Sequence, residues 1–234
     1  MLFVNVNAEK RCVFVAGGTG YLGRPLITEL LRKAHIVRAL VRAGSEHKVP
    51  SGCEQIYGSP LNRSTYQQQI APADTFVHLV GVAHPSPSKA AEFRSIDFKS
   101  ACESISAAVT AGIQHFVYVS VAHPAPMMKA YIAIRNECED LLRGSGMNAT
   151  ILRPWYVLGP GHRWPYALLP MYWLAERLPG TRDGARRLGL VTRKQMCQAL
   201  VTAVENPAQR LRIVEVPEIR VSGASPRARI TTPA

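Results

Sequence analysis

The chain contains 234 residues, of which 47% are hydrophobic and 19% are charged, and this composition fits one sizeable globular domain. No apolar stretch is long enough to span a membrane, and the N-terminus lacks the basic leader and apolar run of a signal peptide. The five cysteines are odd in number and form no Cys-x-x-Cys pair, which predicts a reduced, cytoplasmic protein.

The formal net charge is +12, and residues 181–234 alone hold ten basic and four acidic side chains. Such a charge can attract a phosphate-bearing ligand, nucleic acid or an acidic lipid surface. The basic residues are scattered and are not interleaved with stacking aromatic residues, as a nucleic-acid groove requires. The sequence therefore favours general solubility and attraction of a phosphate-bearing ligand, and it argues against nucleic-acid binding.

Short apolar strands alternate with helical patterns along the first two thirds of the chain. This alternation predicts an α/β fold in which a parallel sheet is covered by helices on both faces. The expected strands are 12–17, 36–42, 53–58, 74–82, 115–120 and 148–154, and the expected helices are 20–34, 64–70, 89–111 and 128–146.

The rhythm changes after Pro154, where an aromatic, proline-rich segment precedes a helix near 193–205 and a strand at 212–216. We expect a single domain over 11–216, in which 154–216 forms the part on the substrate side. The remaining residues, 217–234, are expected to form a flexible tail.

The first strand–helix junction carries a glycine-rich loop, VFVAGGTGYLG. Its glycines follow one another at three-residue spacing and also satisfy the G-x-G-x-x-G pattern. Glycines allow the backbone to approach a pyrophosphate, which then lies at a helix N-terminus where free N–H groups and the helix dipole favour negative charge. We expect this loop to bind a dinucleotide through Gly17, Thr19, Gly20, Tyr21, Leu22 and Gly23.

The second strand ends in ALVR, so that Arg42 stands where a dinucleotide fold usually presents a residue that contacts the adenine ribose. An acid there binds the ribose hydroxyls of NAD, whereas a base binds the 2′-phosphate of NADP. The first acid after the strand is Glu46. The sequence therefore favours NADP over NAD.

Taken in order, the segments GGTGYLG, ALVR, ADTFVHLVGVA, SIDFKSACESISAAVTAGIQHFVYVS, AYIAIRNECEDLLRGSGMNATILRPWYVLGPG and RRLGLVTRKQMCQALVTAVENP resemble an atypical short-chain dehydrogenase/reductase. The resemblance covers about 11–216 and is nearest to the NAD(P)H-binding, NmrA-like and complex I accessory-subunit-like branch, with NAD-dependent epimerase/dehydratase relatives. It implies a Rossmann-type doubly wound parallel sheet in the order 3-2-1-4-5-6, with a small C-terminal α/β extension on the substrate side. It also implies cofactor contacts from Leu79, Val80, Gly81, Ser120, Tyr131, Arg135, Pro154, Trp155, Tyr156 and Val157.

The catalytic helix of that family carries Tyr-x-x-x-Lys, and here YIAIR places Tyr131 and Arg135 four residues apart on one helical face. By resemblance, Tyr131 is the general acid/base, and Arg135 replaces the lysine that holds the nicotinamide ribose and lowers the pKa of the tyrosine. Ser120 is the candidate for the substrate-polarising hydroxyl. It stands one position before the family's usual place, which Val121 occupies, and alternation points it elsewhere. Ser59 stands where relatives often carry an aspartate near the adenine.

Two near copies, VAHPSPS and VAHPAPM, follow the fourth and fifth strands. Because these strands are neighbours in the inferred order, His84 and His123 are candidates to face one crevice with Tyr131. The alternative is that His-Pro is a turn that ends each strand. Carboxylate and cysteine ligands are missing around these histidines, so we predict no metal site. His78, inside the fourth strand, is expected to be a core histidine.

The segment 153–180 contains all three tryptophans of the chain. It can wall a pocket for an apolar or aromatic substrate, or pack as a small subdomain, or face a membrane or a partner. Pro165, Pro170 and Pro179 interrupt any long helix, which counts against a membrane-surface helix.

These patterns favour an NAD(P)-binding oxidoreductase, a reductase or dehydrogenase that acts on a small carbonyl or alcohol compound. The alternative is a non-catalytic dinucleotide-binding protein, either a redox sensor or a subunit or assembly factor of a larger complex. Val121 and Arg135 keep that alternative open because both depart from the catalytic pattern of the family. A homo-oligomer is compatible with either function.

Overall fold

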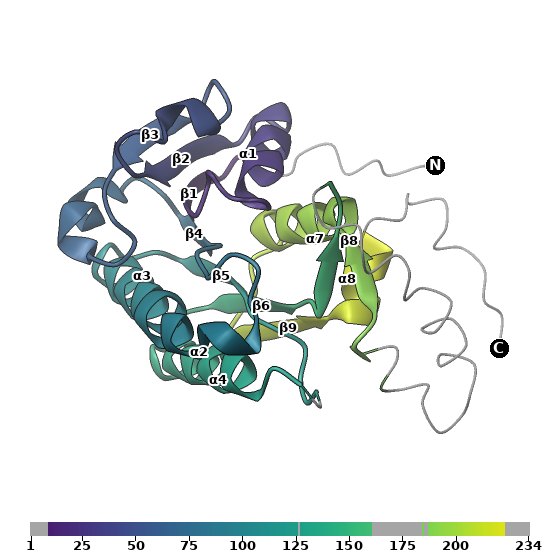
Figure 1. Cartoon of the computed structure of the whole chain (residues 1–234). Coiled ribbons are helices and arrows are strands. Elements are labelled where there is room, and N and C mark those ends of the chain that lie inside the picture. The colour runs from purple at the N-terminus through teal and green to yellow at the C-terminus, as the bar shows by residue number, and fades with distance from the viewer. Residues whose placement is uncertain (1–8, 126, 161–183, 185–186, 223–234) are drawn as a thin grey trace, which may run out of the picture.

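The computed structural model describes residues 9–125, 127–160, 184 and 187–222. Seven strands form one parallel sheet in the order β3-β2-β1-β4-β5-β6-β9 (Figure 1). This order confirms the predicted doubly wound arrangement and adds one strand beside β6. The strands are β1 (Cys12–Ala16), β2 (Ile36–Val41), β3 (Glu54–Tyr57), β4 (Thr75–His78), β5 (His115–Val119), β6 (Ala149–Arg153) and β9 (Leu211–Glu215), and a separate parallel pair is formed by β7 (Tyr156–Leu158) and β8 (Leu190–Thr192).

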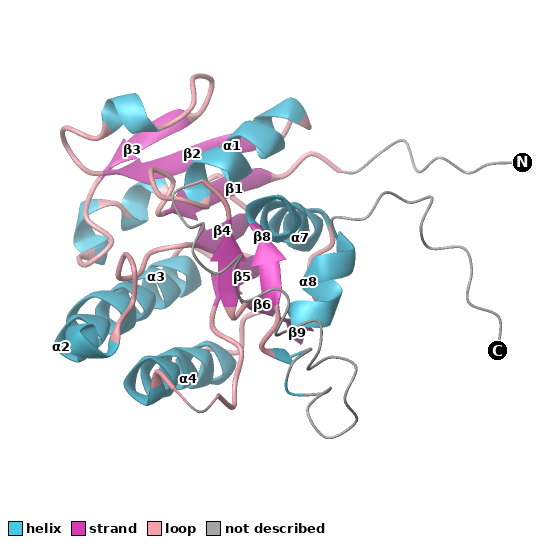
Figure 2. Cartoon of the chain, turned by 45° about the vertical axis from the view of Figure 1, so that its right-hand side comes forward, coloured by secondary structure: helices cyan, strands magenta, loops and turns pink. Residues whose placement is uncertain are grey.

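Helices cover both faces of the large sheet (Figures 1 and 2). They are α1 (Gly23–Arg32), α2 (Ala90–Glu92), α3 (Lys99–Thr110), α4 (Lys129–Gly144), α7 (Arg193–Glu205) and α8 (Val216–Ser222). Side chains of α1, α7 and α8 belong to one hydrophobic core, and side chains of α3 and α4 belong to a second core on the other face. Within the described part of the chain, no helix combines the length and the apolar character that crossing a membrane requires.

The alternation of side chains along β1 explains why two cores form. Val13 and Val15 are fully buried in the core under α1 and α7, whereas Phe14 and Ala16 are fully buried in the core under α3 and α4. Successive side chains of a strand point to opposite faces, so a strand covered on both sides is apolar at every position. The short apolar runs of the sequence therefore predicted this sheet correctly.

The helix predicted over 89–111 exists but is not uniform. A π-helical segment, Phe93–Phe98, lies between α2 and α3, and the helical run ends before Gly112, whose φ is +69°. Gly112 can adopt this left-handed conformation without steric cost, which ends the helix. Single π-helical turns inside α-helices are frequent at functional sites.

Two expectations about local structure need correction. The segment 64–70 is helical, but it is divided into two short 3-10 helices, Arg63–Thr65 and Gln67–Gln69. Between them Tyr66 has a φ of −145°, and its buried ring packs on Phe14 with ring centroids 5.9 Å apart. The expected flexible tail begins too early. Helix α8 reaches residue 222 because Ile219 is buried in the core, and 223–234 lie outside the described residues.

A buried ion-pair network joins α4 to the edge of the sheet. Glu139 of α4 is fully buried and accepts hydrogen bonds from Arg153 of β6 at 2.9 and 2.5 Å. It also accepts one from Arg143 at 2.8 Å, and Arg153 donates to Glu215 of β9 at 3.0 Å. Burial raises the pKa of Glu139, but the hydrogen bonds and charges of Arg153 and Arg143 outweigh burial, so that its pKa lies below the ordinary range.

We expect Glu139→Gln to lower the free energy of unfolding by about 3–5 kcal/mol, because it removes the fully buried anion of Arg153 and leaves only the partly exposed Glu215 as its partner. Asp140→Asn is the matched control, since Asp140 pairs with the same Arg143 at 2.8 Å but its side chain is 74% exposed. Chemical denaturation at neutral pH measures both changes. A loss in Glu139→Gln no larger than in Asp140→Asn would contradict this account.

The pH dependence of the same network has a definite sign. A carboxyl whose pKa is lower in the folded state stabilises the fold above its unfolded pKa, and this stabilisation is lost as the pH falls through the folded pKa. Wild type should therefore lose more stability on acidification than Glu139→Gln does.

Candidate active site

The glycine loop between β1 and α1 is packed too closely for side chains. Gly17 has a φ of +90°, and a Cβ there would lie 2.8 Å from the carbonyl carbon of Leu79 at the end of β4. A Cβ at Gly23 would overlap the carbonyl oxygen of Gly17. The amide of Gly20 donates to that same carbonyl at 3.0 Å. The loop is therefore a tight turn held against the end of β4.

The N-terminus of α1, next to this loop, has no side-chain cap on its backbone N–H groups. Its N-cap residue, Leu22, makes no side-chain cap, and no acidic residue occupies the first turn. Gly20 is exposed, and a Cβ there would meet only the Gly17 carbonyl oxygen, at 3.2 Å. An uncapped helix N-terminus beside an exposed glycine fits a phosphate group well.

The residues that follow β4 lie beside the glycine loop. Leu79 and Val80 are half-buried, and Gly81 is exposed at the carboxyl end of the sheet. The amide of Leu79 donates to the Ala16 carbonyl of β1 at 2.8 Å, which holds these residues beside the glycine loop. The structure thus brings together the predicted contacts from the first and fourth strands.

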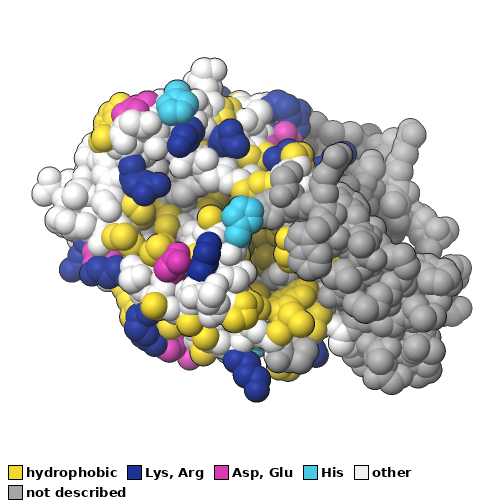
Figure 3. All heavy atoms as spheres, viewed as in Figure 1, with side chains coloured by type: hydrophobic (Ala, Val, Ile, Leu, Met, Phe, Trp, Pro, Cys, Tyr) yellow, Lys and Arg dark blue, Asp and Glu magenta, His cyan; other side chains and the backbone are white. Residues whose placement is uncertain are grey.

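Arg42 is exposed and directly follows β2. The nearby Glu46 is used within its own loop, where its carboxylate accepts a hydrogen bond from the Gly44 amide at 3.0 Å. The role of Arg42 as a phosphate ligand stays a prediction, as does any contact of Ser59 with the adenine. On the face that Figure 3 shows, the lysine and arginine side chains of the described residues are scattered and do not gather into one patch.

Tyr131 and Arg135 lie one turn apart near the N-terminus of α4, as the sequence predicted. The half-buried ring of Tyr131 packs on Phe93 of the π-helical segment, with ring centroids 5.0 Å apart. The guanidinium carbon of Arg135 lies 5.0 Å from the centroid of the Tyr131 ring, which is within the range of a cation–π contact.

Arg135 is buried, and hydrogen bonds fix both ends of its guanidinium. Nη1 donates to the hydroxyl of Tyr118 at 3.1 Å and to the carbonyl of Val119 at 3.0 Å, while Nη2 donates to Asp97 Oδ1 at 2.5 Å. The other Asp97 oxygen accepts a hydrogen bond from the Val82 amide at 3.0 Å. Arg135 is therefore held where the carboxyl ends of β4 and β5 meet.

Asp97 is the functional residue that sequence reasoning missed. It is fully buried in the π-helical segment, yet the sequence contains a signal for it. Asp97 stands four residues after Phe93 and four before Ala101, on the apolar face of an amphipathic helix. An acid in that position requires a buried partner, because acidic side chains are almost never fully buried unless they are paired.

Arg135 acts on the Tyr131 phenol in the expected direction, but the expected net pKa, below the ordinary tyrosine value, is wrong. Burial is the largest influence on the Tyr131 phenol and raises its pKa; the charge of Arg135 opposes this rise, and the carboxylate of Asp97 adds to it. The net pKa lies above the ordinary tyrosine value of about 10. The spacing in the sequence reveals the cation, but it reveals neither the burial of the Tyr131 phenol nor the buried Asp97 carboxylate that pairs with Arg135.

Ser120 is buried beside Glu139, where its hydroxyl helps to lower the pKa of that carboxyl. Glu139 stands eight residues after Tyr131, which is about 12 Å along the helix. This placement counts against Ser120 as the group that polarises a substrate next to Tyr131. The following residue, Val121, is also buried.

The histidines separate into different environments. Nε2 of His123 lies 3.8 Å from Glu139, and His84 is exposed with a φ of +50°, so this placement does not support one crevice shared with Tyr131. His78 is a buried core histidine, as predicted, with Nδ1 3.0 Å from the hydroxyl of Ser104. Burial, with the charge of Arg135, lowers the pKa of His78 to about 3.

The backbone after β6 lies beside the loop after β5. The carbonyl of the buried Pro154 accepts a hydrogen bond from the Ala122 amide at 3.0 Å, and the next three residues, Trp155, Tyr156 and Val157, are half-buried. The predicted contacts from the fifth and sixth strands therefore share one end of the sheet. Residues 161–180 of the aromatic segment 153–180 lie outside the described residues. The predicted role of these residues as a wall of a substrate pocket therefore also falls outside the described structure.

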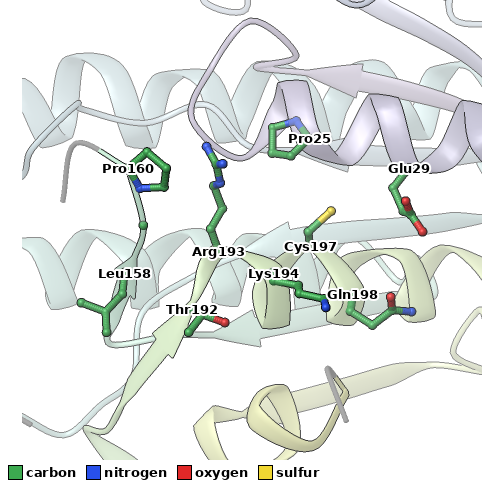
Figure 4. A pocket seen from close by; sticks show the side chains of 10 residues that line it. Pro25, Glu29, Leu158, Pro160, Thr192, Arg193, Lys194, Cys197 and Gln198 are labelled. Carbon is green, nitrogen blue, oxygen red and sulfur yellow. The ribbon is translucent and has the colours of Figure 1, made fainter. Parts of the chain in front are cut away.

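A cavity of about 440 Å³ lies between α1, the end of β7 and the start of α7 (Figure 4). Arg193 and Lys194 line it from α7, and Pro25 and Glu29 line it from α1. Most of its lining residues lie in 154–216, the part expected on the substrate side, but the residues named above as cofactor contacts are not among them. Neither Tyr131 nor Arg135 lines this cavity.

Comparison with known proteins agrees with this geometry. The model of a family described as NAD(P)H-binding matches residues 17–207. The 4-hydroxy-2-methyl-3-oxo-4-farnesyl-3,4-dihydroquinoline-1-oxide ketoreductase of Stigmatella aurantiaca is 29% identical to 82% of this chain. The ceramide reductase of Caulobacter vibrioides is 26% identical to 90% of it. The chain spans 64% and 66% of the lengths of these two relatives, slightly less than two thirds.

Solved structures show the same fold. The enzyme WbmH of Bordetella bronchiseptica, solved in complex with NAD+, superposes with a TM-score of 0.66 over 88% of this chain and 75% of its own. The two sequences are only 19% identical, so this likeness concerns the fold alone.

We expect Gly20→Val to abolish dinucleotide binding while leaving the fold intact, because its side chain would project from an exposed position of the loop with a single close contact, to the Gly17 carbonyl. Gly144→Val is the control, since a Cβ at the end of α4 would meet no atom within 4 Å. Calorimetric titration with NADPH and with NADH measures binding, and circular dichroism checks the fold. Wild-type affinity in a folded Gly20→Val protein would remove this loop from the binding site.

Proposed function

The chain belongs to the NAD(P)H-binding family, and from this premise we propose that it is an NAD(P)-dependent reductase or dehydrogenase of a small carbonyl or alcohol compound. One observation carries the proposal: the Tyr131 phenol and the Arg135 guanidinium of α4 lie together where the carboxyl ends of β4 and β5 meet. The strand β4 is also the neighbour of the glycine loop. A proton donor beside the expected position of a hydride donor is the minimum that such a reaction requires.

Residues at the carboxyl ends of the strands would hold the cofactor. Its pyrophosphate would lie at the glycine loop, since close backbone approach and an uncapped helix N-terminus favour a phosphate there. When bound, the cofactor supplies the hydride in reduction or accepts it in oxidation. Further contacts are proposed from Leu79, Val80, Gly81, Pro154, Trp155, Tyr156 and Val157.

Tyr131 holds the proton that a carbonyl oxygen takes up during reduction. Because burial raises the pKa of the phenol above its ordinary value, Tyr131 is protonated at neutral pH. A protonated phenol is a general acid and not a base. The proposed role of Tyr131 at neutral pH is therefore to donate a proton in carbonyl reduction.

The proposed substrate has an apolar part. The names of the two relatives include a farnesyl group and ceramide, and both of these carry long hydrocarbon chains. In this chain, the half-buried side chains of Trp155 and Val157 offer apolar surface directly after β6. Apolar walls with few polar groups are typical of sites for such compounds.

A non-catalytic dinucleotide-binding protein is the second candidate. Two observations favour it: Arg135 is bound to Asp97 in place of a free lysine-like cation, and the family's usual position for the substrate-polarising hydroxyl is occupied by the buried Val121. Cofactor binding without turnover of any carbonyl compound would support this candidate over the reductase.

We propose NADP as the preferred cofactor, with Arg42 binding its 2′-phosphate. A charge-assisted hydrogen bond contributes roughly 1.5–3 kcal/mol, so Arg42→Ala should weaken NADPH binding by about 10- to 100-fold and leave NADH binding nearly unchanged. Arg24→Ala, which alters an exposed arginine of α1, is the control for loss of general positive charge. Equal weakening of both cofactors in Arg42→Ala would show that Arg42 does not select between them.

We expect Tyr131→Phe to reduce turnover by about 10²- to 10⁴-fold and to leave cofactor affinity almost unchanged, because only the proton donor is lost. Tyr57→Phe, at an exposed tyrosine of β3, is the matched control. Steady-state kinetics would use the carbonyl compound found in a screen of ketones that bear long hydrocarbon chains. Full activity in Tyr131→Phe would end the catalytic role of this residue.

A further inference from the structure

We infer that Asp97 is a positioning residue. Its carboxylate compensates the charge of Arg135, so that the cation orients the Tyr131 phenol without favouring phenolate. This inference rests on the proposed function, because it assigns a purpose to the protonated phenol. It concerns Arg135, which stands where the family's Tyr-x-x-x-Lys pattern has a lysine, and its partner Asp97.

The geometry shows that the two charges form one unit. Arg135 Nη2 and Asp97 Oδ1 are 2.5 Å apart, and the side chains are 7% and 0% exposed. A guanidinium keeps its proton in proteins, and at this distance it favours the charged carboxylate. Burial raises the pKa of Asp97 above its ordinary value; Arg135 and the Val82 amide oppose this rise without cancelling it. Two opposite charges in contact produce a much weaker field at a distance than either charge alone.

The pair is also fixed in position. Tyr118 and Val119 hold one end of the guanidinium, and Asp97 holds the other. Gly81 provides the space: a Cβ there would lie 2.5 Å from Arg135 Nη2 and 2.9 Å from Asp97 Oδ1. An alanine at Gly81 would therefore force the pair apart.

Two tyrosines face this pair: the Tyr118 hydroxyl is bound to Arg135, and the Tyr131 ring packs against its guanidinium. The centroid of the Tyr131 ring is 5.0 Å from the guanidinium carbon of Arg135 on the same helix. Asp97 faces Tyr131 from the π-helical segment, and the Cys138 thiol faces it from the next turns of α4. A lone guanidinium at this distance would favour phenolate, whereas the compensated pair does not.

The test is the titration of the Tyr131 phenol, which requires neither substrate nor cofactor. The full chain is labelled with tyrosine carrying ¹³C at the ζ-carbon, and the Tyr131 resonance is assigned by its loss in Tyr131→Phe. We expect Asp97→Asn to lower the titration midpoint of Tyr131 by about 1 pH unit or more, because Arg135 is then uncompensated. We expect Arg135→Gln to raise it, because the carboxylate then stands alone.

The opposite signs of the two shifts distinguish electrostatic compensation from a merely structural role. The double variant Asp97→Asn with Arg135→Gln restores neutrality and should return the midpoint close to that of wild type. Glu103→Gln is the control, since it removes a carboxylate from the same helical run that pairs with Lys99 at 2.6 Å. It should leave the Tyr131 midpoint unchanged.

An unchanged or raised midpoint in folded Asp97→Asn would overturn the inference. If Asp97→Asn does not fold, Arg135→Gln decides alone, and a lowered or unchanged midpoint in that variant would overturn it. Because the titration is independent of turnover, a protein that shows these shifts but reduces no carbonyl compound would refute the proposed function and leave the compensation established.

Discussion

A guanidinium buried at the carboxyl ends of two parallel strands requires a buried anion, and much of this structure follows from that requirement. Leaving one member of a buried ion pair without its partner costs about 3–5 kcal/mol. Arg135 meets the requirement through Asp97, which the π-helical segment brings to within hydrogen-bonding distance. Gly81 leaves room for the contact. The Tyr131 phenol, packed against the same segment, consequently retains its proton.

The fold itself could be predicted because its signals are local and repeated. Each strand of the large sheet is short and apolar at successive positions, since both of its faces are covered, as Val13 and Phe14 illustrate on opposite sides of β1. The glycine loop was equally predictable. At Gly17 the backbone has a positive φ, and at Gly23 a side chain would overlap the neighbouring carbonyl, so only glycine satisfies both positions.

The contact between Tyr131 and Arg135 could be predicted from the sequence, but the electrostatics around it could not. Spacing along one helix placed Tyr131 beside Arg135, and the structure confirms that contact. The state of the phenol depends on Asp97, which comes from a different helix and is distant in the sequence. The spacing of residues along one helix does not indicate a partner that comes from another segment of the chain. The same limit applies to Ser120, which is buried and helps to lower the pKa of Glu139 on α4.

The central claim is that the Tyr131 phenol lies at the cofactor and keeps its proton there. The most direct measurement is a titration of the full chain, labelled with ¹³C at the tyrosine ζ-carbons, with NADPH at neutral pH. The account predicts a saturable change in the Tyr131 resonance, which keeps the chemical shift of a protonated phenol, and no change at the exposed Tyr57 of β3. Saturable NADPH binding that leaves the Tyr131 resonance unchanged, or that moves it to the shift of a phenolate, would contradict the account.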